Sequence, residues 1–165
     1  MWAWVIQLGA DRGGFYSYDW LENIFGLQIH SATRIVPAWE QRAVGELVQA
    51  DRRGRGGWYV MNVKPERALI LQMSNPKTGR PSRRDEPPHI EFTWSFVLER
   101  RADGRTRLLV RERVAFGTKA ARLVFSPVGF VSFVMTQKMM RGIKARAEAR
   151  DARNTHRLPA SKGTA

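Results

Sequence analysis

Apolar and polar positions alternate most regularly between residues 90 and 116. Apolar side chains occupy every second position from Ile90 to Leu98, and mostly polar side chains lie between them. A period of two is typical of a β-strand with one buried face. The sequence Ala-Asp-Gly-Arg at 102–105 predicts a turn, after which a partner strand begins. The inward positions of that partner strand are Leu108, Val110, Val114 and Phe116.

Shorter strands are expected before this hairpin. Residues 46–50 and 57–63 flank a polar loop that contains glycine, and residues 68–73 follow after a further turn. Prolines and basic side chains are frequent across residues 74–88, which predicts a long exposed loop. These segments together predict an antiparallel meander.

The last long segment of the chain has a helical period. Apolar side chains recur every three or four residues from Val128 to Ile143. Ser126 and Pro127 just before this run are typical of an N-cap and a first helical residue. We therefore expect a long amphipathic helix that begins at Pro127.

Two shorter helices are expected near the N-terminus. Residues 2–8 have the pattern of the last turns of a helix, and residues 19–25 form a second one that Gly26 closes. Residues 29–39 lack a regular period and predict an ordered loop with a short helical turn. Helices at both ends and a central antiparallel meander predict an α+β fold.

Residues 12–26 concentrate glycine and aromatic side chains in one short segment. They read Arg-Gly-Gly-Phe-Tyr-Ser-Tyr-Asp-Trp-Leu-Glu-Asn-Ile-Phe-Gly. Together with residues 27–39 and Val-Gly-Glu at 44–46, this segment resembles a bacterial branch of the SRPBCC superfamily, the START-like or helix-grip proteins. The matching signature residues are Gly13, Gly14, Tyr16, Tyr18, Asp19 and Trp20.

The resemblance implies a helix-grip fold, in which a curved antiparallel sheet wraps around a long C-terminal helix. It also implies a cavity for a lipid, a polyketide-like molecule or another small hydrophobic ligand, with polyketide cyclase activity in some members. It covers residues 1–150 as a single domain that lacks the first strand of the family fold. Either the true N-terminus lies upstream of Met1, or the missing strand leaves an unpaired sheet edge, which favours association. Both a monomer and a homodimer remain open. Residues 151–165 are expected to form a disordered basic tail.

The charge of the chain is strongly basic for a globular protein. The sequence contains 28 basic and 15 acidic residues, which gives a net charge of +13. Such a charge permits contact with nucleic acid or with an anionic membrane surface. Nucleic acid is not expected as a partner because the aromatic side chains fall on inward positions, unlike a base-stacking surface. Peripheral contact with an anionic membrane remains open.

Membrane-spanning and secreted classes are not predicted. The apolar run at 123–135 contains Pro127 and is shorter than the ~20 residues that a membrane span requires. Residues 1–8 lack the basic start and the cleavage site of a secretory signal. We therefore expect a cytoplasmic protein without a transmembrane segment.

The sequence offers little for metal or nucleophilic chemistry. It contains no cysteine, and His30, His89 and His156 are not at metal-ligand spacing. We therefore predict no metal, no cofactor and no assigned catalytic residue. Glu112 falls on the inward face of its strand, so it is either hydrogen-bonded in the cavity or displaced outward by a bulge.

Three functions follow as hypotheses. The first is binding of a small hydrophobic ligand between the sheet and the C-terminal helix, for which aromatic and methionine side chains are suited. The second is an aromatase or cyclase enzyme that uses Glu112, Tyr18 or His30 as acid or base. The third is a basic binder of nucleic acid or anionic membrane. The candidate ligand-binding residues are Tyr16, Tyr18, Trp20, Trp94, Phe96, Glu112, Phe133, Met135 and Met139.

Overall fold

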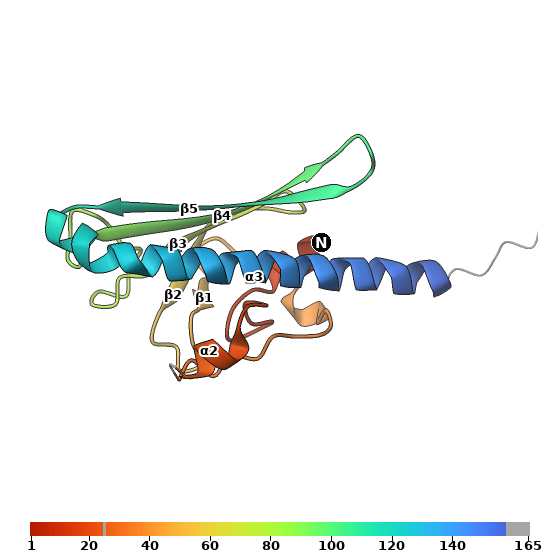
Figure 1. The fold of residues 1–165 in the computed structure, drawn as a ribbon, viewed down its shortest axis with the longest axis horizontal. Coiled ribbons are helices and arrows are strands. Elements are labelled where there is room, and N and C mark those ends of the chain that lie inside the picture. The colour runs from red at the N-terminus through yellow and green to blue at the C-terminus, as the bar shows by residue number, and fades with distance from the viewer. Residues whose placement is uncertain (25, 158–165) are drawn as a thin grey trace, which may run out of the picture.

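Five antiparallel strands follow one another across a single sheet in the order of the chain (Figure 1). The computed structural model describes residues 1–24 and 26–157. Together with a long C-terminal helix and short N-terminal helices, the sheet confirms the predicted α+β helix-grip arrangement. The strands are β1 (Leu47–Gln49), β2 (Gly57–Lys64), β3 (Ala68–Met73), β4 (Ile90–Arg100) and β5 (Thr106–Phe116).

The β4–β5 hairpin has the two faces that the alternation predicts. Trp94 lies directly opposite Glu112, and the register is continuous from one end of the hairpin to the other. Phe96 is fully buried, and Leu108 and Val110 pack against the same core. Because no bulge interrupts this ladder, Glu112 keeps its inward position.

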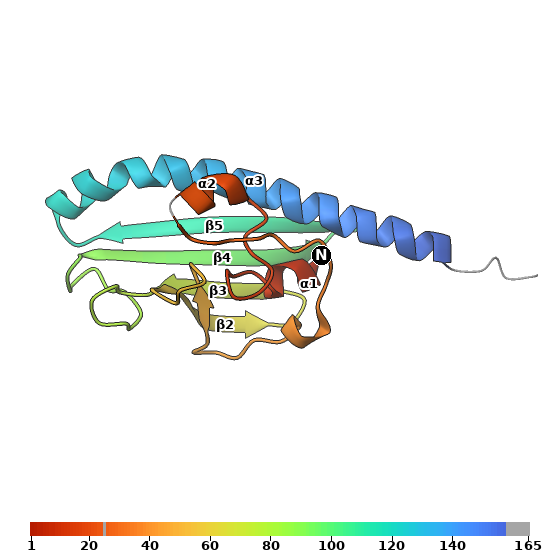
Figure 2. The same ribbon diagram turned by 90° about the horizontal axis from the view of Figure 1, so that it is seen from below.

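The long helix α3 (Lys119–Arg157) begins earlier than predicted. The predicted N-cap at Ser126 is wrong, since the hydroxyl of Thr118 accepts a hydrogen bond from the Ala121 backbone N–H at 3.1 Å. Pro127 lies inside the helix, and the helix axis bends in this region (Figure 2). A proline there leaves the carbonyl of Leu123 without its helical donor, and the high exposure of Leu123 allows water to bond it.

The same helix also continues further than predicted. Residues 151–157 are helical, although the sequence was expected to become a disordered tail after Arg150. This stretch contains alanine and arginine, which extend a helix readily in water. The remainder of the predicted tail, 158–165, lies outside the described residues.

The short N-terminal helices lie at the predicted places. They are α1 (Trp2–Ile6), α2 (Asp19–Ile24) and the 3-10 turn η1 (Pro37–Trp39). Gly26 has a positive φ of 72° and follows α2, and the Leu27 N–H donates back to the Glu22 carbonyl at 3.3 Å. This pattern is the expected glycine-dependent end of a helix.

The glycine and aromatic segment at 12–26 is hydrogen-bonded to the residues that precede and follow it in the chain. The Gln7 amide donates to the buried Tyr16 hydroxyl at 2.9 Å. The Asp19 carboxylate accepts from the Ser31 backbone N–H at 2.7 Å and from its hydroxyl at 2.6 Å. The Gly13 N–H donates to the Gln7 carbonyl at 2.8 Å. These signature residues therefore stabilise the N-terminal segment.

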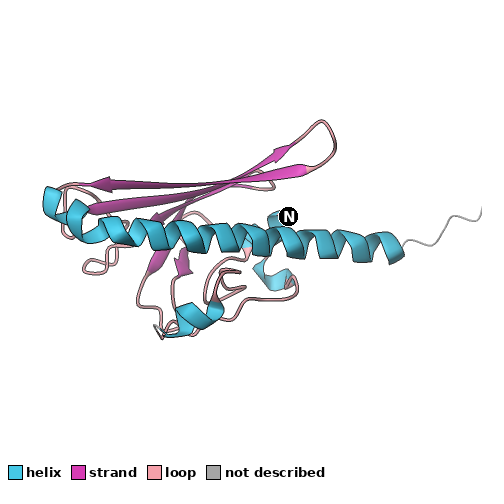
Figure 3. Ribbon diagram, viewed as in Figure 1, coloured by secondary structure: helices cyan, strands magenta, loops and turns pink. Residues whose placement is uncertain are grey.

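The core holds α3 only along its C-terminal half. Met139, Ile143 and Ala147 are buried against side chains of α1 and of the sheet. Figure 3 shows α3 as one helix that crosses the sheet and projects past it. Large apolar side chains on the N-terminal half are exposed instead. These are Leu123, Val124, Val128, Phe130, Val131, Phe133 and Val134.

One helix among the described residues is long and apolar enough to cross a membrane by length and composition. This helix is α3, over Lys119–Arg153, and only 11% of its apolar window is buried. The sequence prediction considered a shorter run and did not identify it. The core helix of a soluble protein can also meet this criterion, but such a helix is mostly buried, unlike this window. The other elements form an α+β domain of the soluble type.

Candidate ligand-binding site

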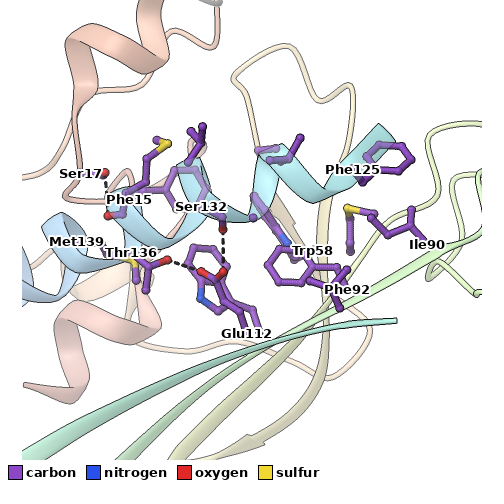
Figure 4. A pocket seen from close by; sticks show the side chains of 18 of the residues that line it. Phe15, Ser17, Trp58, Ile90, Phe92, Glu112, Phe125, Ser132, Thr136 and Met139 are labelled. Carbon is purple, nitrogen blue, oxygen red and sulfur yellow. Dashed lines mark hydrogen bonds between the residues drawn. The ribbon is translucent and has the colours of Figure 1, made fainter. Parts of the chain in front are cut away.

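A cavity of about 600 Å³ lies between the sheet, the N-terminal half of α3 and the N-terminal segment (Figure 4). This volume is within the ~300–1,000 Å³ range of small-molecule sites. Val128 and Val131 line the cavity and are 57% and 50% exposed, so they lie at its opening. The cavity is therefore large enough for a ligand and is open to solvent.

Small side chains on one face of α3 create this space. Phe125, Gly129, Ser132, Thr136 and Met139 line the cavity at alternating spacings of four and three residues. This spacing places all of them on one stripe of the helix. Because the middle of the stripe carries only glycine, serine and threonine, the helix leaves a hollow where larger side chains would fill it.

Aromatic rings form the wall that faces this stripe. The ring centroids of Trp58 on β2 and Trp94 on β4 are 5.3 Å apart. Phe15 packs edge-on against Trp58 at 5.6 Å, and Phe92 stacks on Trp94 at 6.4 Å. Mutual contact restricts each ring, so the sheet presents a pre-formed apolar surface to a ligand.

Glu112 connects the sheet to α3 across the cavity. Its carboxylate accepts hydrogen bonds from the hydroxyl of Ser132 at 2.8 Å and from the hydroxyl of Thr136 (Figure 4). The first of the two predicted arrangements, a hydrogen-bonded glutamate in the cavity, is therefore the observed one. These bonds hold the carboxylate at the wall and engage both of its oxygens.

A second acidic residue, Glu22 of α2, lines the same cavity without comparable partners. Its side chain is 3% exposed, and Oε2 has no hydrogen-bond partner among the described residues. Burial, and secondarily the charge of Asp19, raises the pKa of Glu22 to about 7. The carboxyl group therefore changes charge near neutral pH, inside an apolar space.

Two indole N–H groups complete the polar atoms of the wall. The Nε1 atoms of Trp58 and Trp94 are buried and have no hydrogen-bond partner among the described residues. The lining contains no lysine, arginine or histidine in the described part of the chain. The polar chemistry of the cavity thus consists of two carboxyl groups, several hydroxyls and two free donors.

Four of the predicted ligand-binding residues line this cavity. They are Trp94, Glu112, Met135 and Met139.

The other predicted residues lie elsewhere. Tyr16 and Phe96 are buried in the core and do not line the cavity. Trp20 and Phe133 are 64% and 57% exposed and face solvent. Tyr18 contacts Trp20 edge-on and carries the Lys138 amine 5.6 Å above its ring. Strand periodicity placed Trp94 and Phe96 inward correctly, but the inward face extends further than the cavity, and it does not apply to the solvent-facing Trp20 and Phe133.

Several lining residues were not among the predicted ones. Ser132 and Thr136 could have been found from the stripe of small residues between Phe125 and Met139. Glu22 and Ser17 carried no periodic signal, because they lie on or near a short helix inside an irregular segment. Other cavity-lining residues that were not predicted include Phe15, Trp58, Phe92 and Phe125.

The described residues contain no group of three histidine, cysteine or acidic side chains that could hold a metal ion. Of the three alternative acid or base residues of the enzyme hypothesis, Glu112 lines the cavity, whereas Tyr18 and His30 do not. Glu22 is the acidic group in the cavity whose pKa lies near neutral.

No protein-family model, no curated protein and no solved structure matches this chain. Membership of the SRPBCC superfamily therefore stays a prediction from the signature residues. The function must be argued from the geometry and chemistry of the cavity.

The raised pKa of Glu22 predicts a pH-dependent free energy of unfolding. The folded protein retains a proton up to about pH 7, whereas the unfolded chain releases it near the ordinary value of 4.5. Stability is therefore highest below pH 4.5 for this group, and it is lost as pH rises to about 7. The shift corresponds to about 3 kcal/mol, which water in the open cavity reduces to about 2 kcal/mol.

Glu22→Gln is expected to remove this loss because glutamine has no charge. Urea unfolding at pH 8 should show the variant to be more stable than the parent by about 2 kcal/mol, and at pH 4.5 the two should agree. Glu99→Gln, at an exposed position of β4, serves as the control and should have no comparable effect. Equal stability of Glu22→Gln and the parent at pH 8 would contradict the raised pKa.

Proposed function

We propose that this protein binds a small hydrophobic ligand, such as a lipid or a polyketide-like molecule, in the cavity between the sheet and α3. The single observation that carries the proposal is the open cavity of about 600 Å³ with an aromatic and aliphatic lining. Exposed apolar walls of this size are unfavourable in water, and a ligand of matching shape would cover them. Met135 and Met139 give one wall the flexibility to adjust to the shape of the ligand.

The proposal includes the relation to the helix-grip proteins and the cytoplasmic location that the sequence favours. The helix-grip arrangement supports the first of these, because it encloses a space between a curved sheet and a helix. In this chain the buried contacts of Met139, Ile143 and Ala147 fix one half of α3. The other half stands over the cavity, where a ligand can enter past Val128 and Val131.

Gly129 offers a test that leaves the core intact. It lies on the cavity stripe of α3, and a Cβ atom added there would meet no atom within 4 Å. Gly129→Trp places a large ring in the space that the ligand would occupy. Gly129→Ala adds one methyl group and is the matched control.

The uncharged dye N-phenyl-1-naphthylamine gives the readout through its fluorescence in apolar surroundings. We expect the parent and Gly129→Ala to take up the dye alike, and Gly129→Trp to bind it at least about 10-fold more weakly, a difference of ~1.4 kcal/mol. Native mass spectrometry of the purified parent should detect a co-purifying apolar molecule that Gly129→Trp lacks. Undiminished dye uptake by Gly129→Trp, or none by the parent, would overturn the proposal.

A further inference from the structure

The charge of the cavity is opposite to the charge of the whole chain. The protein carries a net charge of +13, yet Glu22 and Glu112 are the ionisable residues that line the cavity in the described part of the chain. No basic side chain is present there to bind an anion. A ligand therefore meets a negative or neutral interior, although the chain as a whole is basic.

Three polar atoms in this interior have no partner within the described protein. They are Oε2 of Glu22 and the indole Nε1 atoms of Trp58 and Trp94. Buried polar groups are almost always hydrogen-bonded, because an unsatisfied group loses its bonds to water without replacement. All three atoms belong to residues that line the same cavity, so their unsatisfied hydrogen-bonding capacity lies at its wall.

These atoms differ in what they require. The indole N–H groups are donors and need an acceptor oxygen, such as that of a hydroxyl or carbonyl group. The carboxyl group of Glu22 accepts a hydrogen bond from a hydroxyl or an amine. Glu112 is less available, because its oxygens already accept from Ser132 and Thr136.

We propose that the cavity selects apolar molecules with an uncharged or cationic polar group, such as a hydroxyl or an amine, and rejects carboxylates such as fatty acids. The inference rests on the proposed function and adds the ligand class to it. A hydroxyl group can donate to Glu22 and accept from an indole N–H. An amine gains attraction to Glu22 and to the faces of Trp58 and Trp94. A carboxylate would be repelled by both glutamates in surroundings that screen charge poorly.

Three ligands with the same ten-carbon chain test this selection. They are 1-decanol, decylamine and decanoate, each used at pH 8 to displace N-phenyl-1-naphthylamine from the parent protein. We expect decanol and decylamine to displace the dye at concentrations at least about 10-fold lower than decanoate. Displacement by decanoate at the same or lower concentration would overturn the inference.

Glu22→Gln tests which residue causes the selection. The variant keeps the size of the side chain and loses its charge, so decanoate should gain about 5-fold in affinity and decylamine should lose about as much. Glu99→Gln should leave the order of the three ligands unchanged, since Glu99 is exposed on β4, away from the cavity lining. An unchanged preference in Glu22→Gln would assign the selection to another group and overturn the role of Glu22.

Trp58→Phe gives a second variant that does not depend on Glu22. Phenylalanine retains an aromatic ring but has no N–H donor, so the affinity for decanol should fall several-fold more than the affinity for the dye. Failure of the inference is distinguishable from failure of the proposed function. If the parent takes up dye but binds the three ligands equally, only the inference fails, whereas absence of all uptake by the parent rejects both.

Discussion

Replacing Arg42 with methionine is expected to lower the free energy of unfolding by about 4 kcal/mol, the typical effect of breaking a buried ion pair. The Arg42 side chain is fully buried. Its Nε donates to the Ile6 carbonyl at 2.8 Å, and Nη2 donates to the Leu8 carbonyl. Nη1 bonds the Glu46 carboxylate at 2.7 Å. Methionine retains the apolar stem but removes the donor to the Ile6 and Leu8 carbonyls, whereas Glu46 keeps its bond to Arg12.

Arg12→Met provides the comparison for this result. Arg12 also bonds Glu46, at 2.6 Å, but its side chain is partly exposed, so water can replace the lost bonds. We expect this variant to lose about 1 kcal/mol, as for exposed ion pairs. Urea unfolding followed by circular dichroism measures both values. Equal stability of Arg42→Met and Arg12→Met would show that the buried bonds of Arg42 to the Ile6 and Leu8 carbonyls do not stabilise the protein.

The sheet was predictable because one of its faces is buried. A strand with a single buried face must alternate, and a shift by one residue would expose Phe96 and turn Glu91 and Glu99 inward. The same rule placed Glu112 inward, although its hydroxyl partners on α3 could not be known. The hairpin turn at 102–105 then fixed the pairing of β4 with β5.

The start of α3 was not predictable from local signals. Ser126 and Pro127 have the composition of a helix start, and Thr118 is a weaker signal of the same kind. Proline is tolerated at 127 because this part of the helix faces solvent, where water can bond the carbonyl that it leaves free. Exposure of an apolar segment is a tertiary property that sequence periodicity does not contain.

A cavity between the sheet and the C-terminal helix was predicted, but only part of its lining was identified. Trp94 and Glu112 follow from strand parity, whereas Phe96 shares that parity and lies in the filled core. The difference arises from the α3 side chains that face the sheet, because the small Ser132 and Thr136 leave a hollow beside Glu112. Glu22 was missed because a short helix in an irregular segment gives no period to interpret.

Gly142→Ala is expected to lower the free energy of unfolding by about 3 kcal/mol, at the upper end of the usual effect of overpacking. Gly142 lies on α3 where the helix meets the N-terminal segment. A Cβ atom added there would come too close to the Tyr16 carbonyl oxygen and would lie 3.0 Å from the Tyr16 Cβ atom. The backbone of Tyr16 cannot move easily, because its N–H donates to the Ser31 hydroxyl at 2.9 Å and its own hydroxyl is bonded to Gln7.

Gly129→Ala is the matched control, since it introduces the same methyl group on the same helix. The new Cβ atom meets nothing within 4 Å, so the higher helix propensity of alanine should stabilise the protein by about 1 kcal/mol. The changes in the free energy of unfolding, measured by urea unfolding, should therefore have opposite signs for the two variants. A gain in stability for both variants would mean that α3 is not packed closely against Tyr16 at Gly142. The C-terminal half of α3 would then not be what positions the helix over the cavity.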